Sequence, residues 1–144
     1  MLSVYPSIFI KDKQGRYTVI FPDLNHLATC GDDMQEAMEM AVDCLAGYIH
    51  SEQRDGHKLP MPSPVNKIHP SMENIDENDP DIAELFVNLV SVDVEEYAKT
   101  HFNKAVKKTL SIPQWLNDKA TAKKINFSKV LQSALIRELE LRQA

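Results

Sequence analysis

Hydrogen-bond donors alternate with apolar residues along a short segment near the C-terminal end of the sequence. Lys107, Thr109 and Ser111 stand two residues apart and flank the apolar positions Leu110 and Ile112. In a β-strand these two sets face opposite ways. All three polar side chains can donate hydrogen bonds, which is the chemistry that reads base edges in the major groove of DNA. We therefore expect Lys107, Thr109 and Ser111 to contact bases.

A second group of residues could bind the phosphates of the same duplex. Backbone N–H groups at the start of a helix form an anion site, and Ser128 is a predicted N-cap at such a start. Phosphate contacts provide most of the affinity of such a protein and make it decrease with salt. The expected phosphate contacts are Phe127, Ser128, Lys129 and Lys124.

One chain supplies too few elements to hold these residues. The sequence predicts a strand over 106–112 that ends at Pro113, a helix over 114–123 and a second helix from Ser128. A single strand cannot make a ribbon, and about 40 residues bury too little surface to fold alone. Two copies must therefore pair in this region. The predicted dimer core consists of Leu110, Ile112, Trp115, Leu116, Val130, Leu131, Ala134 and Leu135.

The preceding part of the chain has the pattern of a layered α+β domain. Apolar and β-branched runs predict strands over 4–10, 17–21 and 27–30, and a further strand that starts near Phe86. Pro6 suggests that the first strand lies at an edge of the sheet. The order is β-β-β-α-β, with a helix covering one face of the sheet.

The helix of that pattern lies between the third and fourth strands. Apolar residues from Met34 to Tyr48 recur at helical spacing. Asp33 is predicted to cap this helix and Glu36 to complete a capping box. Its three methionines, at 34, 38 and 40, are interpreted as core and flank rather than as a ligand groove. The helix should end near 51–54, before a proline-rich loop over 56–81.

Charge divides the 144 residues into two parts. Residues 1–100 hold 7 basic and 18 acidic residues, whereas 101–144 hold 9 basic and 3 acidic ones. The basic part suits a polyanion, and the acidic part suits a basic protein. On the long helix, Glu36, Glu39 and Asp43 are the carboxylates expected to meet such a partner. A charged face kept for solubility is the alternative interpretation of these carboxylates.

Two resemblances give these patterns a common meaning. The hairpin, the Phe-Pro-Asp-Leu turn at 21–24, the Thr-Cys-Gly-Asp sequence before the helix and the Leu-Pro-Met-Pro-Ser segment at 59–63 resemble the HicB-type antitoxin domain. The stretch over 107–139, with its strand, two helices and intervening turn, resembles a ribbon-helix-helix DNA-binding domain.

The resemblance implies a fold, partners and a domain plan. It implies a partial ribonuclease-H-like domain that silences a HicA-type toxin, a small basic ribonuclease that cleaves mRNA. It also implies repression of the antitoxin's own operon through operator DNA. The expected parts are a toxin-binding domain at 1–97, a linker at 98–105 and a ribbon-helix-helix domain at 106–144. The last would form a homodimer, and assembly beyond the dimer stays open.

Other function classes find less support in the sequence. Asp12, Asp23, Asp32 and Asp33 could suggest a metal-dependent nuclease, but aspartate is common in turns and caps for local backbone reasons. The five histidines lack metal-ligand spacing. We therefore expect no enzymatic activity, metal or cofactor. The alternatives are a repressor whose acidic domain senses a small ligand, a metal-dependent nuclease with a nucleic-acid-binding tail, and a plain dimerisation module with solvated lysines.

The sequence also bears on location. No apolar run approaches the roughly 20 residues of a membrane span, and the N-terminus lacks a secretion signal. We expect a cytoplasmic protein with no membrane partner, in which Cys30 and Cys44 are both reduced.

Overall fold

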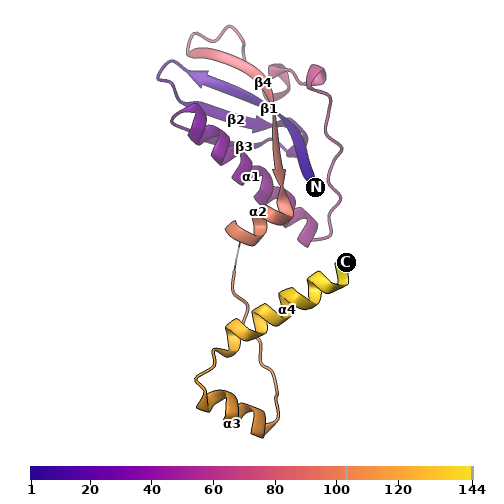
Figure 1. The fold of residues 1–144 in the computed structure, drawn as a ribbon. Coiled ribbons are helices and arrows are strands. Elements are labelled where there is room, and N and C mark those ends of the chain that lie inside the picture. The colour runs from indigo at the N-terminus through magenta and orange to yellow at the C-terminus, as the bar shows by residue number, and fades with distance from the viewer. Residues whose placement is uncertain (103, 144) are drawn as a thin grey trace. The chain divides into compact units, whose positions relative to one another are not determined.

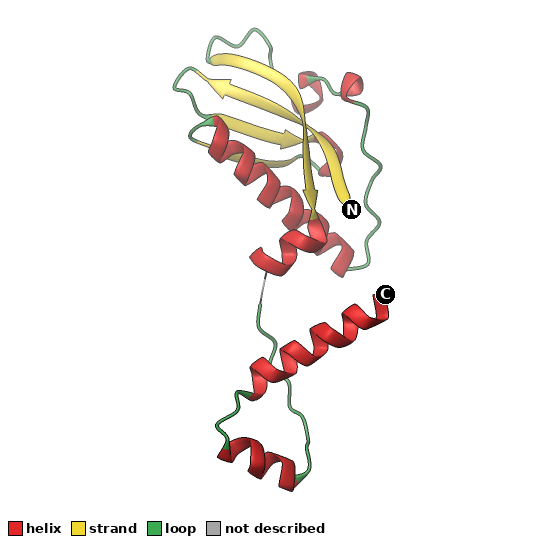
Figure 2. Ribbon diagram, in the orientation of Figure 1, coloured by secondary structure: helices red, strands yellow, loops and turns green. Residues whose placement is uncertain are grey.

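The computed structural model describes residues 1–102 and 104–143, with side chains through residue 140. The chain divides into two compact units, one from Met1 to Lys104 and one from Ala105 onward. The first unit is built on a β-sheet, whereas the second contains helices and no strand among its described residues (Figures 1 and 2).

Four antiparallel strands form the sheet of the first unit. They are β1 (Leu2–Asp12), β2 (Tyr17–Phe21), β3 (Leu27–Gly31) and β4 (Ile82–Asp93), in the spatial order β3-β2-β1-β4. All four predicted strands are confirmed, and β1 and β4 are longer than their apolar runs. The unit is therefore α+β with the predicted order of elements (Figure 1).

The place of β1 corrects the interpretation of Pro6. β1 lies between β2 and β4, so the prediction of an edge strand is wrong. Pairing with β2 begins only at Ile8, whereas pairing with β4 extends from Asp12 back to Leu2. At Pro6, β1 thus has a partner strand on one side only. The missing N–H of proline is tolerated there as it would be at an edge.

Helix α1 (Met34–Arg54) begins and ends where the sequence predicts. Asp33 Oδ1 accepts a hydrogen bond of 2.8 Å from the Glu36 N–H. The Glu36 carboxylate accepts one of 2.6 Å from the N–H of Asp32, one residue before the cap. The capping box therefore forms with its return bond shifted by one residue. Both bonds satisfy N–H groups that the helix itself leaves without an acceptor.

The core of the first unit lies between α1 and one face of the sheet. Gly31 makes this packing possible, because a Cβ there would come within 2.3 Å of the Ala37 nitrogen. Met34, which the apolar stripe includes, is 37% exposed at the start of the helix. The buried helix residues are Ala37, Ala41, Leu45, Ala46 and Ile49, and the sheet contributes Tyr5, Phe9, Tyr17, Val19, Phe21, Val90 and Val92.

The predicted loop over 56–81 is fixed to the rest of the first unit. The Tyr5 hydroxyl donates a 2.6 Å bond to the carbonyl of Pro60. Asp23 accepts two bonds of 2.7 Å, from the N–H and the hydroxyl of Ser63. Asp23 belongs to the Phe-Pro-Asp-Leu turn and Ser63 to the Leu-Pro-Met-Pro-Ser segment. Two of the motifs that carry the family resemblance are therefore bonded to each other.

Short 3₁₀ turns lie within this loop and in the segment that it contacts. η1 (Pro22–Leu24) precedes β3, while η2 (Val65–Lys67) and η3 (Pro70–Glu73) lie within the loop. His26 Nδ1 lies 2.7 Å from Glu73 Oε1, and the Glu73 side chain is only 8% exposed. This pair holds the η3 turn beside the start of β3.

Helix α2 (Val94–His101) follows β4 directly and is capped by Asp93, whose carboxylate accepts a 3.2 Å bond from Glu96 N–H. The segment expected as a linker, 98–105, therefore begins inside a helix of the first unit. Position 103 of that segment, and position 144 at the end of the expected C-terminal domain, lie outside the described residues.

The second unit contains the two predicted helices, α3 (Gln114–Ala122) and α4 (Phe127–Gln143). Asn126 caps α4, since its side-chain oxygen accepts a 3.1 Å bond from Lys129 N–H and its carbonyl accepts the bond from Val130 N–H. The prediction of Ser128 as the cap is therefore wrong. Asparagine serves equally well in this role, and Ser128 lies inside the first turn of α4.

Among residues 1–102 and 104–143, no helix combines the length and apolar character that a bilayer crossing requires.

Candidate nucleic-acid and partner interfaces

The predicted base-contact residues lie in an open stretch of the second unit. Residues 104–113 have no regular secondary structure, and Lys107, Thr109 and Ser111 are all exposed there. The strand expected over 106–112 is not formed within one chain. A strand needs a neighbour for its ladder, and the described part of this unit offers none, so the ribbon stays a prediction.

The predicted phosphate-contact residues gather around the start of α4. Phe127 and Ser128 occupy its first turn, where backbone N–H groups have no acceptor within the helix. The N–H of Lys129 is already bonded to Asn126, so Lys129 can offer only its side chain to an anion. Lys124 lies in the turn before the helix with φ 55°. Two lysines thus lie within a few residues of the start of α4, where the helix dipole is positive.

The predicted dimer core is uncovered in the single chain. Seven of its eight residues are exposed and Leu131 is half-buried. Leu110 and Trp115 are each 62% exposed. No described side chain between 104 and 140 is buried. Large apolar side chains left in water are unfavourable by about 1.5–3 kcal/mol each relative to burial, so covering this surface would stabilise the unit.

The structure adds apolar residues that the prediction of the dimer core omitted. Ile125, Phe127, Ile136 and Leu139 are also exposed. Ile136 follows Leu135, the last predicted core residue of α4. An apolar face wider than the predicted one would have included Ile136 in the dimer core. One side of α4 also carries a groove of about 580 Å³, lined by Ile125, Asn126, Lys129, Val130, Ser133, Ala134 and Arg137.

The three carboxylates expected to meet a basic partner have different environments on α1. The Glu36 carboxylate already accepts the hydrogen bond from the Asp32 N–H at the start of α1. Glu39 is exposed and accepts a 3.1 Å bond from the side chain of Gln35. Asp43 is half-buried and accepts a 2.9 Å bond from the Tyr97 hydroxyl of α2. Burial, reinforced by Asp43, raises the pKa of Tyr97 to about 12, so this phenol keeps its proton at neutral pH.

Two of these carboxylates share a groove that sequence reasoning missed. The α1–α2 groove, of about 490 Å³, is lined by Met38, Glu39, Met40, Val42, Asp43, Tyr97 and His101. Met38 packs against the core as interpreted, but Met40 is 41% exposed and lines the groove. No local signal marks this site, because Tyr97 comes from a helix 54 residues further along the chain than Asp43.

Three of the aspartates considered for a nuclease, Asp12, Asp23 and Asp33, each accept hydrogen bonds from a different part of the first unit. Asp12 accepts from the N–H groups of Gln14 and Arg16 in the β1–β2 turn, Asp23 binds Ser63, and Asp33 caps α1 as described. Across the described residues, no three His, Cys, Asp or Glu side chains are grouped so that they could hold a metal ion.

Known proteins match this chain in sequence and in fold. The family described as "HicB_like antitoxin of bacterial toxin-antitoxin system" matches residues 5–135. Antitoxin HicB 1 of Photorhabdus laumondii is 38% identical over 63 residues, which cover 44% of this chain and 41% of that protein. Antitoxin HicB of Escherichia coli K12 is 36% identical over 62 residues, which cover 43% of this chain and 45% of that protein. The matched region thus spans less than half of each of these relatives.

A solved structure extends the similarity to nearly the whole chain. A chain of the toxin–antitoxin complex from Streptococcus pneumoniae has a TM-score of 0.61 and 30% sequence identity, and the match covers 96% of this chain and 99% of that one. The family match runs through the sheet, both helices that pack with it and most of the second unit. This chain therefore belongs to the HicB-like family of antitoxins of bacterial toxin–antitoxin systems.

Proposed function

We propose that this protein neutralises a HicA-type toxin, an mRNA-cleaving ribonuclease, and represses its own operon by binding operator DNA as a dimer. The first unit would bind the toxin, and the second would pair with its copy and bind DNA. Membership of an antitoxin family supports the role as a whole.

The observation that carries the DNA-binding role is the uncovered apolar surface of the second unit. Two copies would cover it by packing α3 and α4 together, and the two 106–112 segments would then lie side by side as a ribbon. Leu110 and Ile112 would face the helices of the dimer. Lys107, Thr109 and Ser111 would lie on the outer face, where a two-stranded ribbon can enter the major groove.

The start of α4 supplies the second half of this interaction. A phosphate there would accept from the N–H groups of Phe127 and Ser128, with Lys124 and Lys129 adding charge. These contacts would position the ribbon without reading sequence. The acidic first unit would be repelled by the same duplex, which leaves it available to a basic protein.

The DNA-binding role is tested with the full-length protein and labelled DNA from upstream of its gene. We expect that DNA to bind more tightly than a scrambled duplex of the same length. Raising the salt concentration should weaken both complexes. Lys124→Ala should weaken both equally and reduce the slope of log affinity against log salt by about 2, because each dimer loses two phosphate contacts. Equal affinity for the two duplexes at every salt concentration would contradict operator recognition.

The toxin-binding role is tested by co-expression with the product of the adjacent open reading frame. A short basic protein that copurifies with this chain, and whose growth inhibition the chain relieves, is the expected result. Failure of the adjacent product to bind would contradict the antitoxin assignment at this locus.

A further inference from the structure

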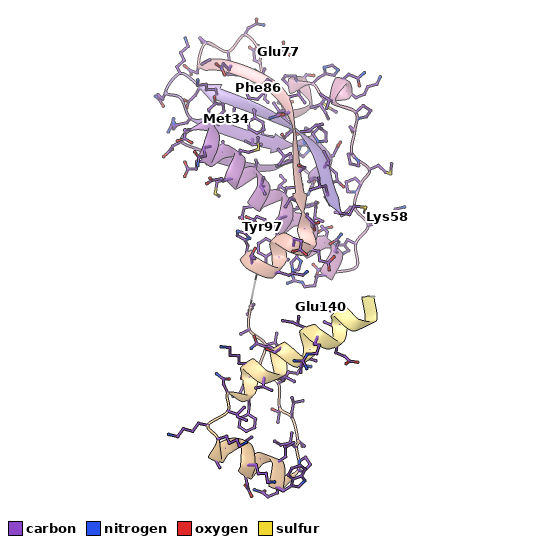
Figure 3. All side chains as sticks on the ribbon, viewed as in Figure 1. Met34, Lys58, Glu77, Phe86, Tyr97 and Glu140 are labelled. Carbon is purple, nitrogen blue, oxygen red and sulfur yellow. The ribbon has the colours of Figure 1, made fainter. Side chains whose placement is uncertain are left out.

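We propose that the α1–α2 groove is the docking site for the toxin, and that its occupant is an apolar side chain flanked by lysine or arginine. This inference rests on the proposed function and specifies which surface of the first unit performs it. The groove joins residues 38–43 of α1 to α2, where Tyr97 is labelled in Figure 3. Met34, the first residue of α1, does not line it.

The composition of the groove fits an occupant that is both apolar and basic. Met38, Met40 and Val42 supply an apolar surface, and the flexible thioethers of methionine adapt to the shape of a partner. Glu39 and Asp43 add carboxylates to the lining. Acidic residues also predominate in the unit as a whole, with 18 among residues 1–100 against 7 basic ones. A basic protein would be attracted over long range and then held by charge pairs at the groove.

The groove has a fixed wall before any partner arrives. The Tyr97 hydroxyl is bonded to Asp43, and the ring of His101 stacks on that of Tyr97 with 3.8 Å between centroids and 7° between planes. Phe102 meets the Tyr97 ring edge-on at 5.6 Å. Little ordering of this wall would be needed on binding, which lowers the free-energy cost of association.

A second copy of this chain fits the groove less well than a basic partner does. The two first units would approach each other with the same excess of carboxylates, and like charges brought together at an interface oppose association. The core cluster between α1 and the sheet is also buried without the groove being filled. The groove is thus available to a different protein.

The test compares groove variants with matched variants elsewhere in the first unit. Met40→Lys and Glu39→Lys alter exposed groove residues, so neither should disturb the core. Met34→Lys places the same new charge on an exposed methionine of the same helix outside the groove, and Glu84→Lys reverses an exposed carboxylate on β4. Each full-length variant is titrated with the purified product of the adjacent open reading frame, and its binding to operator DNA is measured in parallel.

We expect Met40→Lys to weaken toxin binding about 100-fold, mainly through faster dissociation. Glu39→Lys should slow association about threefold to tenfold, and added salt should reduce that difference. Both controls should bind within about twofold of wild type, and operator affinity should not change.

Three outcomes would overturn the inference. They are wild-type affinity in Met40→Lys, an equal loss in Met34→Lys, and release of a preformed first-unit dimer by Met40→Lys, which would assign the groove to a second copy. If the wild-type chain itself fails to bind the adjacent product, the proposed function fails with it. Toxin binding by wild type together with an unaffected Met40→Lys refutes only the choice of surface.

Discussion

The two units of this chain differ in how much of their apolar surface they bury alone. In the first unit, Phe9, Phe21 and Leu45 are fully buried. In the second, no described side chain between 104 and 140 is buried, and Trp115 is 62% exposed. The core of the first unit is formed within one chain, whereas we propose that the second unit obtains its core from another copy. The following predictions test this difference.

The largest effect is expected from Leu135→Asp. A carboxylate placed in the proposed apolar interface would be unpaired there, and burying it is very unfavourable. We expect the dimer to dissociate and operator binding to be lost while the first unit keeps its fold, as judged by sedimentation velocity and near-UV circular dichroism.

The matched control for Leu135→Asp is Leu2→Asp, which alters a leucine of the first unit that is 62% exposed. It should leave the oligomeric state unchanged. Equal dissociation by both variants would show that the first unit also holds the dimer together, and the contrast between the units would then be wrong.

Leu45→Ala should destabilise the first unit by about 2–5 kcal/mol, because it leaves a cavity between α1 and the sheet. Denaturant unfolding followed by a probe in each unit should show only the first transition moving. Movement of both transitions together would mean that the two units unfold cooperatively.

Thr109→Ala and Ser111→Ala should each weaken operator binding by about 1–3 kcal/mol per lost base contact and relax sequence preference. The dimer should persist, since neither residue belongs to its core. Fluorescence anisotropy with operator and scrambled duplexes measures both quantities. Unchanged discrimination in both variants would remove these residues from base recognition.

The smallest effect is expected from Tyr97→Phe, which removes one hydrogen bond of the first unit, worth about 1 kcal/mol. The raised pKa of Tyr97 means that the folded state holds the phenol proton more tightly than the unfolded state does. The stabilisation is therefore complete below pH 10 and is lost as the pH rises to about 12. Burial also raises the pKa of Tyr5, so tyrosinate absorbance should keep a late-titrating component in Tyr97→Phe but lose the contribution of Tyr97.

Local signals in the sequence account for most of the fold. Asp33 and Glu36 predict the start of α1 because capping bonds join residues three or four positions apart. The same local rule led to the prediction of Ser128 as the cap of α4, whereas the structure uses Asn126, two residues earlier. The prediction from Pro6 was wrong because a proline is tolerated wherever a strand lacks a neighbour on one side. How far β2 extends along β1 is a property of strand pairing, which the local sequence does not give.

The features that could not be predicted depend on contacts between residues far apart in the sequence or in different molecules. The α1–α2 groove requires Asp43 and Tyr97 to meet, and nothing in either local sequence indicates that contact. The ribbon over 106–112 depends on a strand from a different molecule. The alternation of polar and apolar residues predicts this strand, but a single chain offers it no strand to pair with.

The exposed, irregular backbone at 104–113 also has a consequence for turnover. Proteases cut extended, accessible segments most readily, and a cut here would detach the basic unit while sparing the acidic one. Strand pairing between copies would shield the same peptide bonds. Dilution of the protein would therefore favour cleavage, so that the capacity to silence transcription would decay before the capacity to bind a partner protein.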